Sequence, residues 1–113
     1  MKIRIQAAVQ EDLLEGCSFY ERQEKGLGSY FIDSIFSDID SLQLYAGIHP
    51  VHWGFHRMLS LRFPYAIYYR VDDSEVKVYA VVNCMRNPLK TSRKLKEGVS
   101  SSRAKKRRLP LLH

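Results

Sequence analysis

Apolar and polar side chains alternate along the chain from residue 55 onward. Between residues 55 and 63 the odd-numbered positions are mostly large and apolar, whereas the even-numbered positions carry His56, Met58, Ser60 and Arg62. Side chains of a strand alternate between its two faces, so this stretch predicts a strand with one buried face. Pro64 cannot donate a hydrogen bond to a neighbouring strand and marks a bend.

Two more strands are predicted directly after the first. Residues 65–71 are rich in aromatic and β-branched side chains, which favour strands. A polar turn at 72–74 leads into residues 75–85, which alternate at first and then become wholly apolar, as a central strand does. Because Tyr68 and Tyr69 point to opposite faces, we expect at most one of them in the core.

The part of the chain before these strands changes from strand spacing to helix spacing. Residues 2–8 alternate and predict a short strand. Residues 10–24 predict a helix whose apolar stripe is Leu13, Leu14, Cys17 and Tyr20. Three acidic residues fall in its expected first turns, where the helix dipole favours them: Glu11, Asp12 and Glu15. Gly16 lowers helix propensity by about 1 kcal/mol relative to alanine.

A second helix is predicted over residues 29–45. Glycines 26 and 28 end the first helix because glycine accepts positive φ, and Ser29 is a suitable N-cap for the second. The apolar stripe of this helix consists of Phe31, Ile32, Ile35, Phe36, Ile39 and Leu42. Its expected solvent side consists of Asp33, Ser37, Asp38 and Asp40.

The element order β-α-α-β-β-β predicts an α+β fold. The N-terminal strand and the helical hairpin precede a mainly antiparallel, curved sheet, and the hairpin covers its inner face. We expect residues 1–88 to form one domain and residues 89–113 to form a basic, partly disordered tail. Within the tail, 91–98 can form one or two helical turns, whereas 100–102 and 105–108 are expected to lack regular structure.

The net charge of +6 is unevenly distributed. Residues 1–88 hold nine Lys and Arg against eleven Asp and Glu, a net of −2, whereas residues 89–113 hold nine against one, a net of +8. The expected domain is therefore slightly acidic, and the high isoelectric point belongs to the tail. A basic tail of this kind can contact nucleic acid or remain a solvated end.

The lengths of the apolar runs and the positions of the two cysteines indicate where in the cell the protein is expected to be. Lys2 and Arg4 interrupt the N-terminal apolar positions, and no run approaches the roughly 20 apolar residues of a membrane-spanning helix. Cys17 and Cys84 both lie in apolar patterns and are expected to be buried, inert thiols in a reducing compartment. The sequence therefore predicts a cytoplasmic protein that does not interact with membranes.

Three histidines within eight residues raise the question of a metal site. His49, His52 and His56 are separated by Pro50 and Gly54, and this spacing matches neither a metalloprotease helix nor a zinc finger. We expect no metal at this loop.

Four arginines in the strand region are the better candidates for a binding site. They are Arg57, Arg62, Arg70 and Arg86. The guanidinium group is always charged and its planar donors suit phosphates and carboxylates. The alternative is that these arginines pair with Asp72, Asp73 or Glu75, or lie exposed. Arg57 and Arg62 point to opposite faces of an unbulged strand, so the four cannot all line one groove.

These residues resemble the RelE/ParE superfamily, the toxins of type II toxin–antitoxin systems, also called the plasmid stabilisation family. The resemblance covers about residues 2–88, and its most specific part is RFPYAIYYRV at 62–71 followed by VYAVVNCMRNP at 78–88. Weaker matches are AVQEDLL at 8–14, residues 19–21, residues 26–28 with Phe31, and Arg57 with Leu59. The family fold it implies is the one described above, with no cofactor.

The family contains two branches with different targets. RelE-like members cut mRNA on the ribosome, and by resemblance Arg57 and Arg86 would be the phosphate-binding and catalytic arginines. ParE-like members bind DNA gyrase and are not nucleases. Residues 46–56 lack the basic cluster of the RelE branch, Cys84 stands where many relatives carry His, and no Tyr or His follows Arg86 before His113. Missing proton-transfer groups typically cost a factor of about 10²–10⁴ in rate.

The resemblance therefore favours a ParE-like toxin that inhibits growth by binding. Both branches imply a cognate antitoxin whose C-terminal segment wraps the toxin as a helix and as an added strand. Arg57, Arg62, Arg70 and Arg86 would then contact acidic residues of the antitoxin or of the target. Three readings stay open: a gyrase inhibitor, a ribosome-dependent mRNA endonuclease, and a decayed, non-toxic member that acts as a small binding domain.

Overall fold

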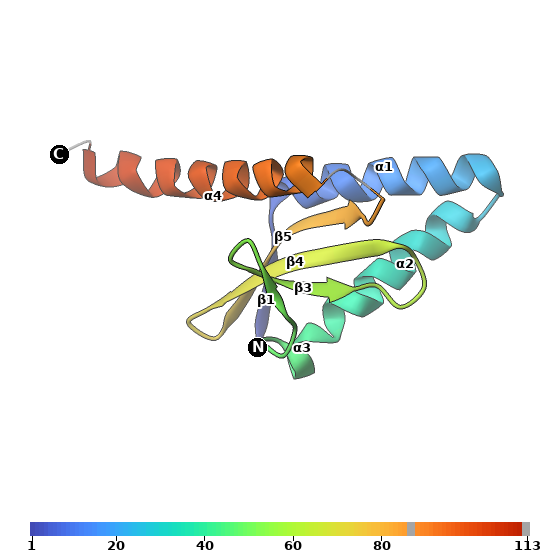
Figure 1. Cartoon of the computed structure of the whole chain (residues 1–113), viewed down its shortest axis with the longest axis horizontal. Coiled ribbons are helices and arrows are strands. Elements are labelled where there is room, and N and C mark those ends of the chain that lie inside the picture. Colours follow the sequence, from blue (N-terminus) through green and yellow to red (C-terminus); the bar gives the residue numbers. More distant parts are fainter. Residues whose placement is uncertain (86–87, 112–113) are drawn as a thin grey trace.

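The computed structural model describes residues 1–85 and 88–111, and it describes side chains as far as Val99. Figure 1 shows a sheet with long helices behind it and another long helix along one edge. The strands are β1 (Lys2–Ile5), β2 (Val51–His52), β3 (Phe55–Leu59), β4 (Tyr65–Asp72) and β5 (Glu75–Asn83). The helices are α1 (Ala7–Gln23), α2 (Leu27–Asp40), α3 (Leu42–Tyr45) and α4 (Pro88–Leu111).

The five strands form one sheet in the order β1-β5-β4-β3-β2. All neighbours are antiparallel except β1, which pairs parallel to β5. The prediction that the strand beginning at residue 75 is central is therefore confirmed. The predicted polar turn joins β4 to β5, with Asp73 and Ser74 at φ 46° and 65° as a two-residue hairpin turn requires. The α+β class with a helical hairpin on a mainly antiparallel sheet is likewise confirmed.

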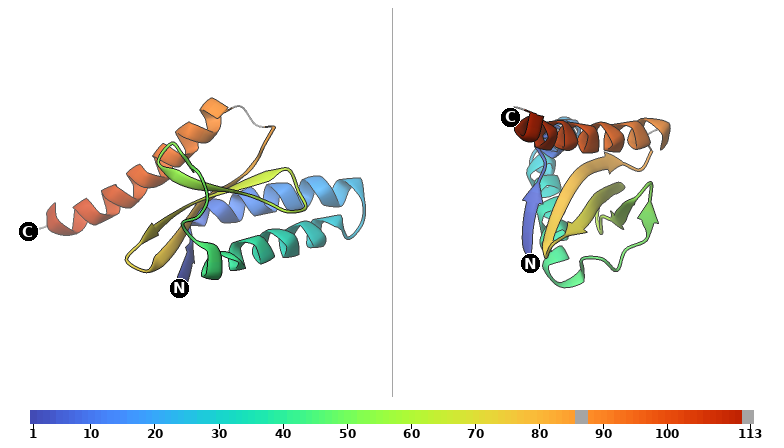
Figure 2. Two further views of the ribbon diagram at one scale, coloured as in Figure 1. Left: turned by 60° about the horizontal axis from the view of Figure 1, so that its bottom comes forward. Right: turned by 90° about the vertical axis from the view of Figure 1, so that its left-hand side faces the viewer.

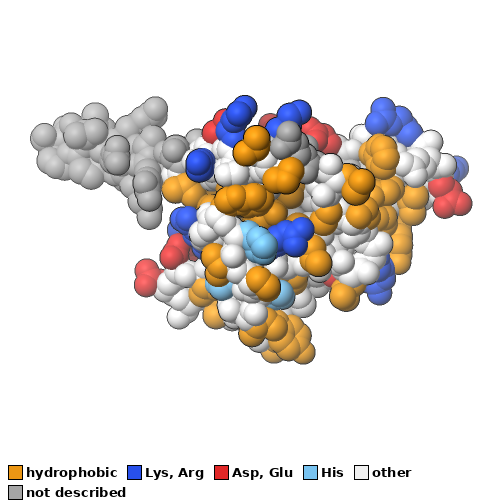
Figure 3. Space-filling view, in the orientation of Figure 1, with side chains coloured by type: hydrophobic (Ala, Val, Ile, Leu, Met, Phe, Trp, Pro, Cys, Tyr) orange, Lys and Arg blue, Asp and Glu red, His pale blue; other side chains and the backbone are white. Residues whose placement is uncertain are grey.

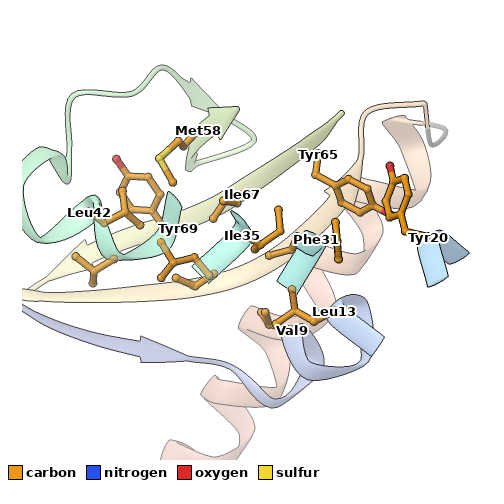
Figure 4. Close-up of a cluster of buried hydrophobic side chains, with 14 residues drawn as sticks. Val9, Leu13, Tyr20, Phe31, Ile35, Leu42, Met58, Tyr65, Ile67 and Tyr69 are labelled. Carbon is orange, nitrogen blue, oxygen red and sulfur yellow. The ribbon is translucent and has the colours of Figure 1, made fainter. Parts of the chain in front are cut away.

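Helices α1 and α2 lie side by side and cover the inner face of the sheet (Figures 1 and 2). Figure 4 shows the resulting inner core, in which Phe31, Ile35 and Leu42 from the helical side meet Ile67 and Tyr69 from β4. Each of these side chains is fully buried. Burial of apolar area at roughly 25 cal/mol per Å² makes this layer the main source of stability.

The burial of three side chains on α1 and α2 differs from the prediction: two apolar ones are exposed and one acidic one is buried. Leu14 is 67% exposed and Phe36 is 39% exposed, because only one narrow face of each helix reaches the sheet. Asp38 is buried, and its carboxylate accepts the hydroxyl of Ser60 at 2.6 Å. A buried carboxylate of this kind is tolerated because it is hydrogen-bonded, which the helical spacing alone does not reveal.

The turn between α1 and α2 is built differently from the prediction. Helix α2 begins at Leu27 after Gly26, whose φ is 88°, so Ser29 is not the cap. The Glu21 carboxylate accepts the N–H of Gly26 at 3.0 Å and that of Gly28 at 2.9 Å. These two hydrogen bonds to the backbone hold the pKa of Glu21 below its usual value. Gly26 thus supplies the positive φ, whereas Gly28 belongs to the helix.

Glycine at position 28 permits the close approach of α1 to α2. A Cβ atom there would lie 2.7 Å from the backbone oxygen of Cys17. We expect Gly28→Ala to lower the free energy of unfolding by about 1–3 kcal/mol, although alanine is the better helix former. Urea denaturation followed by circular dichroism measures the change. The exposed neighbour provides the control, because Ser29→Ala should shift stability by no more than about 0.5 kcal/mol. Equal stability of both variants would contradict the close contact.

A second core lies on the outer face of the sheet, beneath the first half of α4. Leu95 of α4 is 1% exposed and packs with Phe55, Tyr68 and Tyr79. Tyr68 is therefore buried on the outer face while Tyr69 is buried on the inner face. The prediction that only one of them reaches a core is wrong, because it assumed a sheet with a single covered face.

Helix α4 occupies the segment that was expected to be a tail. The predicted helical turns at 91–98 are confirmed, but the helix also continues across 100–102 and 105–108, where irregular chain was expected. Lys and Arg are good helix formers, so the high charge of residues 105–108 did not exclude a helix there. Among the described residues, no helix has the length and apolar character needed to span a membrane.

Asp12 connects α1, β5 and α4. Helix α1 begins at Ala7, three residues earlier than predicted, so Asp12 lies beyond the first turn and is buried. Its carboxylate accepts the N–H of Val81 at 3.0 Å and pairs with the ammonium group of Lys94. Strand β1 ends at Ile5, opposite Val78. The side chain of Asp12 thus takes the place of a strand partner for β5 beyond the end of β1.

Candidate interaction site on the outer face of the sheet

A pocket of about 360 Å³ opens on the outer face, between the β2–β3 turn and the start of α4. We call it the outer-face pocket. Its polar and aromatic walls are His52 and Trp53 from the turn, Arg57 and Tyr68 from the strands, Cys84 after β5, and Thr91 from α4. Figure 3 shows histidine and Lys or Arg side chains next to one another among apolar side chains on this face.

Arg57 is the charged group of the pocket. It lies directly opposite Tyr68 in the β3–β4 pairing, and its Nε donates to the Tyr68 hydroxyl at 3.2 Å. Its Nη2 donates to the Cys84 sulfur at 3.8 Å. Asp72 and Glu75 were possible partners of the arginines. In the described chain they form ion pairs with other residues, Asp72 with Lys77 and Glu75 with Arg4. Arg57 is thus oriented by neutral groups, which leaves its charge for an anionic partner.

Trp53 forms the aromatic rim of the pocket. The two-residue turn that joins β2 to β3 places Trp53 at φ 54° and Gly54 at φ 82°. A positive φ is uncommon for a bulky residue, so the rest of the structure must hold Trp53 in place. Its ring lies 6.0 Å from that of Tyr68, and the side chain is 47% exposed. An exposed aromatic ring beside a cation is typical of a contact surface.

Arg70 contacts the β2–β3 turn and stabilises it. Its Nε donates to the Gly54 carbonyl at 3.0 Å, and its guanidinium lies 4.0 Å from the centre of the Phe55 ring. This arrangement combines a hydrogen bond with a cation–π contact. Arg70 shares the outer face with Arg57 but is engaged in holding the backbone beside the pocket.

The four arginines therefore do not form one cluster. Arg57 and Arg70 lie on the outer face, as the parity of β3 and β4 allows. Arg62 is exposed in the loop between β3 and β4, because β3 ends at Leu59 before reaching it. Arg86 lies outside the described residues, and its place in the site stays a prediction.

The three histidines are also separated. His52 lines the outer-face pocket, whereas His49 and His56 contact Tyr69 on the inner side. In the part of the chain that the structure describes, no three His, Cys, Asp or Glu side chains gather as metal ligands. The loop that carries His49 and His52 instead connects the inner core to the pocket.

Several pocket residues were missed or misplaced by sequence reasoning. Cys84 was expected to be a buried thiol, but β5 ends at Asn83 and Cys84 is exposed beside Arg57. His52, Trp53 and Tyr68 were not associated with Arg57. The family resemblance placed an acid or base at position 84 or after Arg86, whereas the structure brings His52 and Tyr68 to Arg57 from earlier in the chain. These side chains meet Arg57 through the register of β3 with β4 and the β2–β3 turn, which the local sequence pattern does not show.

Comparison with known proteins places the fold. No protein family model and no curated protein matches the sequence. Among solved structures, a chain of the chromosomal ParDE TA (toxin–antitoxin) system from P. aeruginosa superposes with a TM-score of 0.67 at 17% sequence identity. The match covers 74% of this chain and 95% of that chain. This chain has a ParE-like fold.

The ParE-like fold agrees with the family resemblance seen in the strand region. It accounts for the helical hairpin and the sheet, while the roles of individual residues come from this chain's own geometry, because one fold carries many functions. The outer-face pocket of this ParE-like structure is suited to recognition, because it holds one oriented cation, Arg57, next to the Trp53 and Tyr68 side chains.

Proposed function

We propose that this chain is the toxin of a type II toxin–antitoxin module and that a cognate antitoxin neutralises it. The observation that carries this proposal is the fold shared with a chain of a ParDE system. The outer-face pocket supports it independently, since buried aromatic and arginine anchors are the side chains that contribute most at protein interfaces. An acidic side chain of the antitoxin would occupy the pocket and pair with Arg57, while Arg62, Arg70 and Arg86 would contact it nearby.

We propose that this chain inhibits growth by binding a target, such as DNA gyrase, without cutting it. The slight negative charge of residues 1–88 supports this choice, because a surface that enters the ribosome should be strongly basic. The absence of Lys and Arg from residues 46–56 supports it as well. The antitoxin and the target would then compete for the same exposed groups of the outer face.

A ribosome-dependent mRNA endonuclease is the second candidate. The observation in its favour is that His52 and Tyr68 line the same pocket as Arg57. Imidazole and phenol groups can transfer protons, and a guanidinium can stabilise a phosphoryl-transfer transition state. In this reading Arg57 and Arg86 would be catalytic, and His52 would be the first residue to test as an acid or base.

A third candidate is a non-toxic binding domain that contacts nucleic acid through the basic C-terminal segment. Residues 100–113 contain five Lys and Arg and no acidic residue. Removal of residues 89–113 would also remove Leu95 from the outer core, so a chain ending at Val99 is the cleaner test. Growth inhibition that survives this shorter deletion would exclude the segment as the active part.

Induction of the chain in a bacterial host separates the three candidates. Plasmid supercoiling and mRNA integrity are read from the same culture. Lost supercoiling with intact mRNA supports the gyrase proposal. Cleaved mRNA with normal supercoiling contradicts it and favours the nuclease. Normal growth with neither effect favours the non-toxic binding domain.

We expect Arg57→Ala to weaken the antitoxin complex about tenfold or more. Hydrogen bonds to a charged group contribute about 1.5–3 kcal/mol, and about 1.4 kcal/mol is a factor of ten. Isothermal titration calorimetry with the cognate antitoxin measures the change, and Arg57→Ala combined with Arg86→Ala should weaken binding further. Lys25→Ala, an exposed change at the α1–α2 turn, is the control. An unchanged dissociation constant for the double variant would refute the role of these arginines.

A further inference from the structure

We propose that the segment from residue 46 to residue 54 is a pH-sensitive latch for the outer-face pocket, closed while His49 is neutral and released when His49 is protonated. The latch is a property of this chain alone. Its role in regulating partner binding rests on the proposed function, because it assumes that the outer-face pocket receives the partner.

Tyr69 of β4 is the buried residue that the latch segment contacts in its closed state. Its hydroxyl lies 2.9 Å from the backbone nitrogen of Gly47 and 2.5 Å from Nδ1 of His49, and Tyr69 itself is fully buried in β4. The backbone N–H of Gly47 can only donate, so the Tyr69 oxygen accepts it. The hydroxyl proton is then left to be donated to Nδ1 of His49. This arrangement requires an unprotonated Nδ1 and therefore a neutral His49.

Protonation of His49 would remove this acceptor. Nδ1 would become a donor, and the hydroxyl proton of Tyr69 would lose its partner inside the core. A buried donor without a partner is costly, so the protonated form favours separation of His49 from Tyr69. Release of His49 exposes the ring to water, where its positive charge is solvated.

A second histidine lies against the same tyrosine. His56 of β3 stacks on the Tyr69 ring at 5.0 Å, and its Nδ1 donates to the backbone oxygen of His49 at 2.7 Å. The titratable groups that face His49 are thus Tyr69 from β4 and His56 from β3. On the outer face, Arg70 holds the far end of the segment through Gly54. No carboxylate is among these contacts of the described chain, so a charge on His49 would meet histidine and neutral groups.

The direction of the pH dependence follows from these surroundings. Burial, and then the neighbouring His56, lower the pKa of His49, while burial raises the pKa of Tyr69. A histidine whose pKa is lower in the closed form binds its proton more readily in the released form. The closed latch is therefore fully favoured above the ordinary histidine value of about 6.5 and loses stability as the pH falls below it.

The latch is connected to the pocket through the backbone. After His49, the carbonyl of Pro50 accepts the N–H of Arg57 at 2.8 Å, and the chain continues through β2 to Trp53 at the pocket rim. Release of His49 would therefore loosen the edge of β3 beside Arg57 and displace Trp53 from Tyr68. The pocket would lose its aromatic wall at acidic pH.

Trp53 reports this movement directly because it is the single tryptophan of the chain. Its fluorescence is recorded between pH 8 and pH 5 without any partner. His52→Gln is used as the background, since the His52 ring lies 6.3 Å from Trp53 and would itself affect the emission. We expect a red shift and a lower anisotropy with a midpoint below about 6.5, while the far-ultraviolet circular dichroism stays constant.

Two variants in this background test the assignment. His49→Asn places a non-titrating amide oxygen near Nδ1, so the latch should stay closed and the transition should disappear. Tyr69→Phe removes the hydroxyl and should give the released emission already at pH 8. A transition that persists in His49→Asn, or emission of the background protein that is constant with pH, would overturn the latch.

The partner-free readout keeps this proposal separate from the proposed function. If no antitoxin binds but the His49-dependent transition is present, the toxin proposal fails and the latch stands. If an antitoxin binds with an affinity that does not change between pH 8 and pH 5, the latch does not regulate the pocket.

Discussion

Replacement of Leu95 by alanine is expected to lower the free energy of unfolding by about 2–5 kcal/mol, the usual cost of emptying a fully buried leucine site. Leu95 is 1% exposed and is the side chain through which α4 enters the outer core beside Phe55, Tyr68 and Tyr79. The alanine variant loses the transfer free energy of the leucine and leaves a cavity between the helix and the sheet. Urea denaturation followed by circular dichroism measures the loss.

The control for Leu95→Ala lies on the same helix. Leu89 is 73% exposed, so Leu89→Ala should change stability by no more than about 0.5 kcal/mol. Equal effects of the two variants would show that α4 does not dock through Leu95. Thr91, which is buried and lines the outer-face pocket, lies one turn before Leu95. Under the proposed function, loosening of α4 should also weaken antitoxin binding at the pocket, and calorimetric titration with the antitoxin measures this effect.

Replacement of Asp12 by alanine is expected to lower the free energy of unfolding by about 3–5 kcal/mol. The carboxylate is 3% exposed and satisfies both the Val81 N–H of β5 and the ammonium group of Lys94. Its removal leaves the buried Val81 N–H without this acceptor and Lys94, which is 24% exposed, without its ion-pair partner, and the two losses together give this cost. Asp12→Asn should be milder, at about 1–3 kcal/mol, because its amide oxygen can still accept the Val81 N–H.

The Asp12 prediction is checked by the same denaturation experiment with a double-mutant cycle. Lys94→Met removes the charge but keeps an apolar stem, and its effect should not add to that of Asp12→Ala, because the two side chains are in contact. Glu11→Ala is the matched control, since Glu11 precedes Asp12 and is exposed. A loss for Asp12→Ala no greater than that for Glu11→Ala would contradict the bridging role.

The local periodicities of the sequence predicted β1, β3, β4, β5 and the helical hairpin, because those patterns depend on near neighbours, but they did not reveal β2 or the full length of α4. The apolar and aromatic run at 65–71 forms most of β4, and the stripe containing Phe31, Ile35 and Ile39 is the buried face of α2. Boundaries were less accurate. Helix α1 starts three residues earlier than predicted, and the predicted helix over 29–45 is divided into α2 and α3 at Ser41.

The candidate site was predicted only in part. Arg57 was identified from its residue type and position on a strand. Its neighbours Tyr68, Cys84 and His52 could not be associated with it, because they meet only through the strand register and the β2–β3 turn. Asp38 was placed on the solvent side of its helix and Asp12 in the first turns of the other, since helical spacing cannot show that Ser60, Val81 and Lys94 provide hydrogen-bond partners.

The sequence by itself determined the α+β class, the helical hairpin followed by the three long strands, and the resemblance to the RelE/ParE superfamily, because these follow from short-range patterns and local motifs. Only the tertiary structure decided that the sheet is covered on both faces, that Leu95 belongs to a second core, and that His49 and His56 meet at Tyr69. These contacts join segments about 11 to 40 residues apart, as in Leu95 with Phe55 and Arg57 with Tyr68. Such contacts depend on register and docking, and a single leucine among lysines and arginines has no periodicity that reveals them.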